Sequence, residues 1–327
     1  MELVVKSNNH IYDINIPLVE KYRPNKLKDI LLDEFMKLKI KNILKNKQIP
    51  NMIITGEPST GKTSTIMYMV KKIYQDNYYE NVIELNASDD RGLSMISTTI
   101  IPFCKKKTNS NKVIILDEAD SITQKAQNLL NNLINEYKTT RFIFICNDRF
   151  KINEAIQSLC LILNFPKINK IKLKNKLEFI CNNEKIKFTQ NGLNRLLFYS
   201  NYDIRQCINN LECVLYSNSE LNDNLINELF DVPKIEYIKK VIINCNQKKL
   251  KDALNTITIL YDSGYSPNDI LLTFMRYILS NDFDIDMNEE IKLKLYKIIS
   301  SSYIKINDGV NTILQLYGCI SNIYELL

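Results

Sequence analysis

The chain of 327 residues contains a single histidine, His10. One histidine excludes a Ser-His-Asp catalytic triad elsewhere in the chain and every metal site that needs several histidines. Glycine and proline are also scarce, at 7 and 8 residues, and these two residue types punctuate most tight turns. The scarcity therefore indicates a helix-rich protein with few sharp turns.

The eight cysteines include no C-x-x-C pair and stand at positions 104, 146, 160, 181, 207, 213, 245 and 319. Zinc ribbons and dithiol redox sites both use that close spacing, so neither is predicted. We interpret these cysteines as buried apolar thiols of a protein in a reducing compartment.

Long apolar runs are missing as well. No uninterrupted stretch approaches the ~18 residues of a membrane-spanning helix, and the amino terminus lacks a basic region followed by an apolar one. We therefore expect a soluble, intracellular protein. The apolar fraction of 45% supports a genuine buried core, and the length suits two or three domains. A net charge of +6 is compatible with a polyanionic partner but is only mildly basic over this length.

Short apolar runs are present in the first half of the chain, at residues 52–55, 82–85, 113–116, 142–146 and 161–165. They lack strict polar alternation, as expected for strands that are covered on both faces. Segments between them have helical spacing, for example 63–74 with Ile66, Met69, Val70 and Ile73. This alternation predicts an α/β fold in which helices flank a parallel sheet, with any ligand at the carboxyl ends of the strands.

The strand pattern ends at Pro166, and the rest of the chain is predicted to be helical, over 174–217 and again over 233–327. Leu and Ile recur there at spacings of three and four. Prolines mark both predicted joints, near residues 166 and 232. The predicted domains are therefore 1–166 with the sheet, 167–231 with a small group of helices, and an all-α domain over 232–327.

A phosphate-binding loop is predicted at Gly56 to Thr63, where the sequence GEPSTGKT fits G-x-x-x-x-G-K-[ST] between a predicted strand and a predicted helix. In such loops the glycines let backbone N–H groups face the β-phosphate. Lys62 is expected to bridge β and γ oxygens, and Thr63 to ligate Mg²⁺. The candidate nucleotide-binding residues of this segment are Gly56, Glu57, Pro58, Ser59, Thr60, Gly61, Lys62, Thr63 and Ser64.

Two carboxylates follow the apolar run at 113–116, which would deliver them to the carboxyl end of a buried strand. Asp117 is expected to hold the magnesium and Glu118 to orient the attacking water. A third strand ends in Asn147, whose amide would lie beside the γ-phosphate. The predicted catalytic residues are therefore Lys62, Asp117, Glu118 and Asn147, and the predicted metal ligands are Thr63 and Asp117. Together they predict hydrolysis of a nucleoside triphosphate rather than mere binding.

Further segments complete an ordered set of six with the loop at 56–63. They read PLVEKYRP at 17–24, ELNASDDRG at 84–92, DEAD at 117–120, FICN at 144–147 and DIR at 203–205. This set resembles the motifs of the replication factor C small subunits, and the resemblance extends from about residue 17 to the carboxyl terminus. It assigns Tyr22 and Arg23 to an adenine pocket, Asn147 to sensor 1 and Arg205 to sensor 2.

The resemblance implies an AAA+ ATPase domain, a helical lid and a carboxyl-terminal collar domain that packs with four other subunits. It implies ATP and Mg²⁺ as cofactors, and it implies sister subunits, a sliding clamp and primer-template DNA as partners. The expected function is ATP-driven loading of the clamp during DNA replication or repair. The expected location is the nucleus or another site of DNA replication, a viral replication compartment included.

Three departures from the family pattern affect this expectation. Leu159 stands between Ser158 and Cys160, where small subunits commonly carry an arginine that reaches the neighbour's ATP site. Asn131 and Asn132 replace two arginines, and Ser59 replaces a glycine, which is tolerable if φ at Ser59 is negative. Leu159 has neither charge nor donor, so either the neighbouring ATP site is idle or a nearby cation such as Arg149 or Lys151 substitutes.

Contact with DNA through this chain is expected to be weaker than in typical relatives, because residues 93–99 contain no lysine. Family members track the duplex with basic residues at this place. Lys105, Lys106, Lys107 and Lys125 remain candidates for sequence-independent phosphate contacts, although a lysine run is also typical of a solvated loop.

Three functions therefore stay open. The first is an active clamp-loader ATPase, which Lys62, Thr63, Asp117 and Glu118 favour. The second is a structural subunit that holds ATP without hydrolysing it, which Leu159 and the asparagine pair favour. The third is another AAA+ ATPase of DNA metabolism, such as an origin-loading or Holliday-junction enzyme, and the segment at 84–92 speaks against it.

Replacing Leu159 by arginine tests whether the neighbouring ATP site lacks its activating cation. An arginine finger contributes roughly 10³ to 10⁵ in rate where it operates. We expect Leu159→Arg to raise the ATPase rate of the assembled ring, whereas Leu159→Gln, which supplies a polar group without charge, leaves it unchanged. An unchanged rate in Leu159→Arg would contradict the hypothesis that this position limits the neighbour's site.

Overall fold

The computed structural model describes residues 16–88, 93–108, 110–217, 219–230, 233–279, 285 and 287–327. Three features of the sequence lie outside these residues. They are His10, residues 89–92 of the segment ELNASDDRG, and the predicted joint at 231–232. The chain forms two compact units, residues 1–222 and 223–327, which are described separately.

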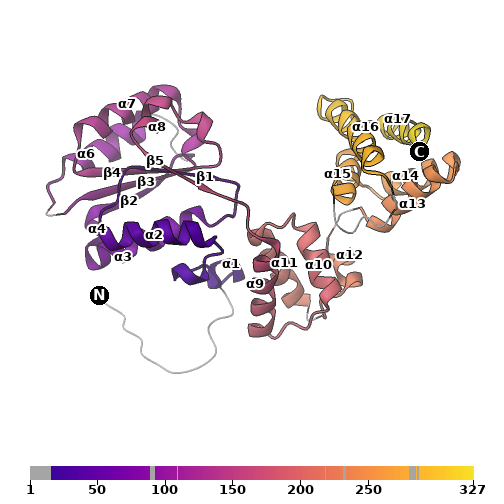
Figure 1. Ribbon diagram of the computed structural model, residues 1–327, viewed down its shortest axis with the longest axis horizontal. Coiled ribbons are helices and arrows are strands. Elements are labelled where there is room, and N and C mark those ends of the chain that lie inside the picture. Colours follow the sequence, from indigo (N-terminus) through magenta and orange to yellow (C-terminus); the bar gives the residue numbers. More distant parts are fainter. Residues whose placement is uncertain are drawn as a thin grey trace. The chain divides into compact units, whose positions relative to one another are not determined.

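A five-stranded parallel sheet forms the centre of the first unit (Figure 1). Its strand order is β2-β3-β4-β1-β5, and every neighbouring pair is parallel. All five predicted strands are confirmed, as β1 (Met52–Gly56), β2 (Val82–Asn86), β3 (Lys112–Asp117), β4 (Thr140–Cys146) and β5 (Leu161–Phe165). The three inner strands are almost wholly buried, which explains why their sequences are apolar rather than alternating.

Helices cover both faces of this sheet (Figure 1). One face packs against α2 (Glu34–Asn46) and α3 (Lys62–Tyr74), with Ile40 and Met69 in the core. The other packs against α7 (Gln124–Glu136), α8 (Glu154–Ser158) and α6 (Ile101–Lys105). The short segments of this unit are η1 (Leu27–Asp29), η2 (Gln75–Asn77), α4 (Tyr78–Asn81), η4 (Ala119–Ser121) and η5 (Arg149–Lys151).

Residues 93–105 form an irregular helix. It runs through α5 (Leu93–Met95), a wider π-helical turn, η3 (Ile96–Ile100), and α6. Pro102 is the second residue of α6 and has no N–H to donate to the preceding turn. The candidate DNA-contacting lysines are all exposed, namely Lys105, Lys106, Lys107 and Lys125. Exposure is required both for contacts to DNA phosphates and for a solvated loop, so it does not separate these two interpretations.

A small helical domain continues the first unit. It consists of α9 (Lys170–Asn183), α10 (Gln190–Tyr199) and α11 (Ile204–Ser217), against which α1 (Leu18–Lys21) packs. Asn169 and Thr189 cap α9 and α10, each accepting a backbone N–H of the first turn with its side-chain oxygen. The apolar side chains Leu173, Leu177 and Leu211 are fully buried. The helical prediction for this region is confirmed.

The second unit consists of helices alone among its described residues. They are α12 (Asp223–Leu229), α13 (Ile235–Asn246), α14 (Leu250–Asp262), α15 (Pro267–Leu279), α16 (Glu289–Asn307) and α17 (Ile313–Leu326). The spacing of three and four in the sequence produces one apolar core around Phe274 and Tyr277. In the described part of the chain, every helix is too short or too polar to cross a lipid bilayer.

Lys112 is a charged residue at the start of β3 that is only 3% exposed. Its Nζ donates hydrogen bonds to the carbonyl oxygens of Phe103, Cys104 and Lys106, at 2.9, 2.7 and 2.6 Å. These carbonyls lie at the carboxyl end of α6, where the last carbonyls have no partner within the helix and a cation is favourable. Burial lowers the pKa of Lys112, so its desolvation opposes this gain in part.

We expect Lys112→Met to destabilise the first unit by about 2 kcal/mol. The three charge-assisted hydrogen bonds outweigh the relief of desolvation, because the carbonyl of Cys104 would stay buried without a donor. Hydrogen exchange should show lost protection in α6 and β3, with a lower unfolding midpoint in urea. The exposed Lys138→Met serves as the control and should stay within about 0.5 kcal/mol of the parent; equal stability of the two variants would refute the role.

Candidate functional site

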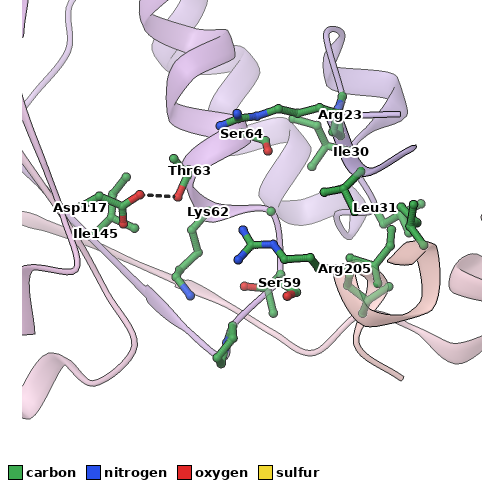
Figure 2. A pocket seen from close by; sticks show the side chains of 18 of the residues that line it. Arg23, Ile30, Leu31, Ser59, Lys62, Thr63, Ser64, Asp117, Ile145 and Arg205 are labelled. Carbon is green, nitrogen blue, oxygen red and sulfur yellow. Dashed lines mark hydrogen bonds between the residues drawn. The ribbon is translucent and has the colours of Figure 1, made fainter. Parts of the chain in front are cut away.

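A cavity of about 890 Å³ lies at the carboxyl ends of the inner strands, between the loop after β1, the segment around α1 and helices α9 and α11. Figure 2 shows part of its lining. Thirteen of the sequence-predicted site residues line it, namely Tyr22, Arg23, Pro58, Ser59, Thr60, Gly61, Lys62, Thr63, Ser64, Asp117, Glu118, Asn147 and Arg205. The remaining two, Gly56 and Glu57, contact Lys62 through their carbonyl oxygens.

Two glycines permit the course of the loop after β1. Gly56 has φ +148°, and a Cβ there would lie 2.3 Å from the carbonyl oxygen of Phe165 on the neighbouring strand. Gly61 has φ +87° and precedes α3 without a side-chain cap. The first N–H groups of α3 therefore have no side-chain acceptor from the cap position, which is the arrangement that binds phosphate at helix amino termini.

Lys62 is the most buried charge of the site, at 8% exposed. Its Nζ donates to the carbonyl oxygens of Gly56 and Glu57, both at 2.7 Å, and to Oδ1 of Asn147 at 2.9 Å. Burial lowers the pKa of Lys62, Asp117 opposes that shift, and Arg205 adds to it as a second cation nearby. Two cations directed at one cavity favour a ligand of high negative charge.

The carboxyl end of β3 is joined to α3 by a hydrogen bond (Figure 2). Thr63 Oγ1 donates to Oδ2 of Asp117 at 2.8 Å, and the backbone N–H of Glu118 donates to Oδ1 of Asp117 at 2.9 Å. A hydroxyl and a carboxylate oxygen held together are ligands of the type that Mg²⁺ prefers. Glu118 has a left-handed backbone, φ 52°, and its exposed side chain belongs to the cavity lining.

Asn147 joins the end of β4 to the same place. Its side chain accepts from Lys62, and its carbonyl oxygen accepts a hydrogen bond from Thr55 Oγ1 on β1 at 3.2 Å. The β1, β3 and β4 ends are therefore fixed around the amino terminus of α3, as the parallel strand order requires.

The other end of the cavity is apolar. Its wall includes Val19, Ile30, Leu31, Ile168, Ile204 and Ile208 beside the ring of Tyr22. The Tyr22 hydroxyl donates to Glu184, whose carboxylate also pairs with Lys21 at 3.1 Å. Burial and the hydrogen bond to Glu184 raise the pKa of Tyr22 to about 12. A flat heterocycle fits such a wall of aliphatic and aromatic side chains.

Sequence analysis did not identify this apolar wall. Val19 and Ile204 lie within the motifs at 17–24 and 203–205 but were not singled out there, and the other members lie outside every motif. A further signal was the spacing of Ile204 and Ile208, four residues apart on one helix face and directly after Asp203. That signal cannot be separated from the ordinary core pattern of a helix.

The sequence-based condition on Ser59 was wrong. Its φ is +61°, in the left-handed region, rather than negative. This conformation costs a residue with a side chain roughly 1 kcal/mol relative to glycine. Ser59 Oγ donates a hydrogen bond to Oδ2 of Asp203 at 2.9 Å, and a bond to a charged acceptor offsets a cost of that size.

Arg205 lies in the first turn of α11, as predicted for a lid helix. Its backbone N–H and that of Gln206 donate to Oδ1 of Asp203, at 2.8 and 3.2 Å. The guanidinium extends into the cavity near Lys62 and Ser59 (Figure 2).

Leu159, Asn131 and Asn132, which sequence analysis singled out by the resemblance, are absent from the lining of this cavity. Leu159 is 37% exposed at the carboxyl end of α8. Arg149 is exposed in η5 and stacks on Phe150, with 5.0 Å between the guanidinium carbon and the ring centroid. Asn131 and Asn132 lie on α7.

Comparison with known proteins agrees with this architecture. Residues 52–166 match the model of the AAA family of ATPases, and residues 233–322 match the Replication factor C C-terminal domain. A protein of Acanthamoeba polyphaga mimivirus named as a replication factor C small subunit is 37% identical over 314 residues, 95% of this chain and 97% of its own length. Replication factor C subunit 2 of Arabidopsis thaliana is 36% identical over 314 residues, 94% and 93% of the two chains.

Among solved structures, the Holliday junction branch migration motor RuvB of Thermotoga maritima matches with a TM-score of 0.53 over 68% of this chain and 78% of that one. The identity is 12%, so this likeness concerns the fold alone. The sequence relatives identify which AAA family the chain belongs to, because they are 36–37% identical to it over nearly its whole length. The chain therefore belongs to the replication factor C small subunits, the AAA+ clamp-loader components of DNA replication.

Proposed function

We propose that this chain binds ATP with Mg²⁺ in the cavity between the loop at 56–63 and α11, and hydrolyses it within an assembled clamp loader. One observation carries the proposal. Thr63 contacts Asp117, and Lys62 contacts Asn147, at 2.8 and 2.9 Å, so a triphosphate site, a metal site and a sensor amide converge on one point. These groups come from three separate segments of the sequence, which a chance motif would not bring together.

Binding would use both ends of the cavity. The adenine ring would lie against Tyr22 and the aliphatic wall, with Arg23 at the rim. The phosphates would accept hydrogen bonds from the loop backbone and from the amino terminus of α3. Lys62 would exchange a carbonyl acceptor for phosphate oxygens, and Arg205 would approach the γ-phosphate from the lid.

Thr63 and Asp117 are the residues that would hold Mg²⁺, because their oxygens already lie together at the edge of the triphosphate site. When bound, the metal supplies positive charge that offsets the charge developing on the phosphate oxygens.

The proposed reaction is in-line attack by water on the γ-phosphorus. A bond forms from the water oxygen to phosphorus, and the bond from phosphorus to the β–γ bridging oxygen breaks, giving ADP and inorganic phosphate. Glu118 lies at the cavity, orients the water and accepts its proton. Asn147 would hold the γ-phosphate and the water by its amide, while its Oδ1 keeps Lys62 in place.

We further propose that nucleotide state controls assembly and clamp opening on primer-template DNA. Sister subunits, in a pentamer, and a sliding clamp are the proposed partners, at the nucleus or another site of DNA replication. In this scheme residues 1–166 form the ATPase domain, 167–231 the lid and 232–327 the collar. The proposed phosphate contacts to DNA are those of the exposed lysines at 105–107 and 125.

A second candidate function is a subunit that holds ATP and contributes interfaces without turnover. Leu159 favours it, because an exposed leucine at the end of α8 offers no charge to a neighbouring site. Arg149 and Lys151 are both exposed in η5, which lies beside α8, since Gln157 Nε2 donates to the Arg149 carbonyl at 3.1 Å.

Glu118→Gln separates the two functions. Glutamine keeps the size of the side chain but cannot accept the proton, so ATP hydrolysis in the assembled ring with clamp and primed DNA should fall by about 10²- to 10⁴-fold. ATP affinity should stay within about threefold, because Glu118 is assigned no contact with the nucleotide. Glu34→Gln, an exposed residue of α2, serves as the control. An unchanged hydrolysis rate in Glu118→Gln would contradict the catalytic assignment and favour the structural subunit.

Lys62→Met should weaken ATP binding without loss of folding stability, whereas Lys112→Met should lower folding stability. We expect roughly 100-fold weaker ATP binding, since charge-assisted bonds to phosphate are lost, and a folding stability that is unchanged or slightly higher. Stability is retained because Asn147 lines the cavity and Gly56 and Glu57 are half-buried and exposed, respectively, so water can replace the lost donor, and because a buried charge is removed. Calorimetric titration with ATP and urea unfolding of both variants measure this. Parental ATP affinity in Lys62→Met would exclude the proposed phosphate contact.

A further inference from the structure

The phosphate loop and the lid are joined by a side-chain hydrogen bond. Ser59 Oγ donates to Oδ2 of Asp203 at 2.9 Å, across 144 residues of sequence. A glycine at position 59 would have no side chain to form this bond. The serine holds its left-handed backbone, φ +61°, while making it.

Asp203 uses both carboxylate oxygens. Oδ2 accepts from Ser59, and Oδ1 accepts the backbone N–H groups of Arg205 and Gln206 at the start of α11. The carboxylate that caps α11 is therefore the same group that attaches α11 to the loop. A displacement of the loop therefore moves Asp203, and with it Arg205, which lies two residues further along the chain.

Further hydrogen bonds and ion pairs join the lid to the sheet domain at other places. Glu184 and Glu212 hold the α1 segment, through Tyr22, Lys21 and the Leu18 N–H, and Lys172 Nζ donates to the Leu32 carbonyl at 2.9 Å. At the phosphate end, Lys167 pairs with Glu57 at 2.9 Å, but both side chains are more than half exposed. An exposed pair of this kind contributes little, so the Ser59–Asp203 bond is the stronger link from loop to lid at the phosphate end.

We propose that Ser59 is a positioning residue that latches the lid to the phosphate loop through Asp203 and thereby holds Arg205 over the γ-phosphate position. This inference rests on the proposed function of the same cavity. The latch retains ATP longer than ADP, because only ATP offers the γ-phosphate that Arg205 reaches. A subunit with this device releases ATP slowly.

The test measures dissociation rates of fluorescent ATP and ADP analogues by stopped flow, on the full chain with Mg²⁺. The variants are Ser59→Gly, Asp203→Ser and the double variant. Glycine suits the left-handed backbone, and serine at 203 still caps α11 but is too short to reach residue 59. The control is Ser266→Ala, which removes a hydroxyl donating to the carboxylate of Asp269 at 2.7 Å in the second unit.

We expect ATP release to accelerate about tenfold in each single variant and by no more than that in the double variant, since both remove one bond. ADP release should change less than threefold, and Ser266→Ala should match the parent. Hydrogen exchange at the first turn of α11 should rise in the same variants. A loss of packing alone would instead accelerate ATP and ADP release equally.

Three outcomes overturn the latch. They are parental ATP release in either single variant, equal acceleration for ATP and ADP, and multiplication of the two effects in the double variant. The parent chain distinguishes the latch from the function on which it rests. If the folded parent binds neither nucleotide, the proposed function fails and the latch with it; if the parent binds both, an adverse result counts against the latch alone.

Discussion

The site depends on one constraint, the placement of the amino terminus of α3 against the carboxyl ends of β3 and β4. The Thr63–Asp117 and Lys62–Asn147 hydrogen bonds fix that placement from two sides. Gly56 makes it sterically feasible, because a side chain there would collide with the backbone of β5. The parallel order β3-β4-β1 then brings acid, amide and loop to one edge of the sheet.

Two buried lysines show how similar chemistry serves different ends. Lys112 and Lys62 each donate to three oxygens, and burial lowers the pKa of both. The acceptors of Lys112 are the carbonyls that end α6, so its charge stabilises a helix. One acceptor of Lys62 is the side chain of Asn147, which follows another strand and lines the cavity, so the charge of Lys62 is available to a ligand. The environment of the acceptors, rather than the burial of the charge, separates a structural lysine from a binding one.

Much of this architecture was predictable from sequence. The apolar runs located all five strands, because strands covered on both faces need continuous apolar sequence, and the loop motif placed Lys62 and Thr63 at a helix start. Ser59 illustrates what was not predictable. Its left-handed backbone is stabilised by Asp203, a partner 144 residues away that no local pattern reveals. The apolar wall was missed for a related reason, since Ile204 and Ile208 have the spacing of any buried helix face.

The family assignment and the geometry contribute different parts of the account. Sequence relatives over nearly the whole length identify a replication factor C small subunit, whereas the likeness to RuvB concerns the fold. The geometry adds a serine in the phosphate loop that contacts the lid and an exposed leucine at the end of α8.

The central claim is that a triphosphate and its metal occupy the space between the loop at 56–63 and the acids at 117 and 118. The most direct measurement is the affinity of the purified, folded chain for ATP by calorimetry, with Mg²⁺ and with the metal removed by chelation. The account predicts saturable binding of one ATP per chain that weakens when Mg²⁺ is removed. Absence of ATP binding by folded protein in the presence of Mg²⁺ would contradict it.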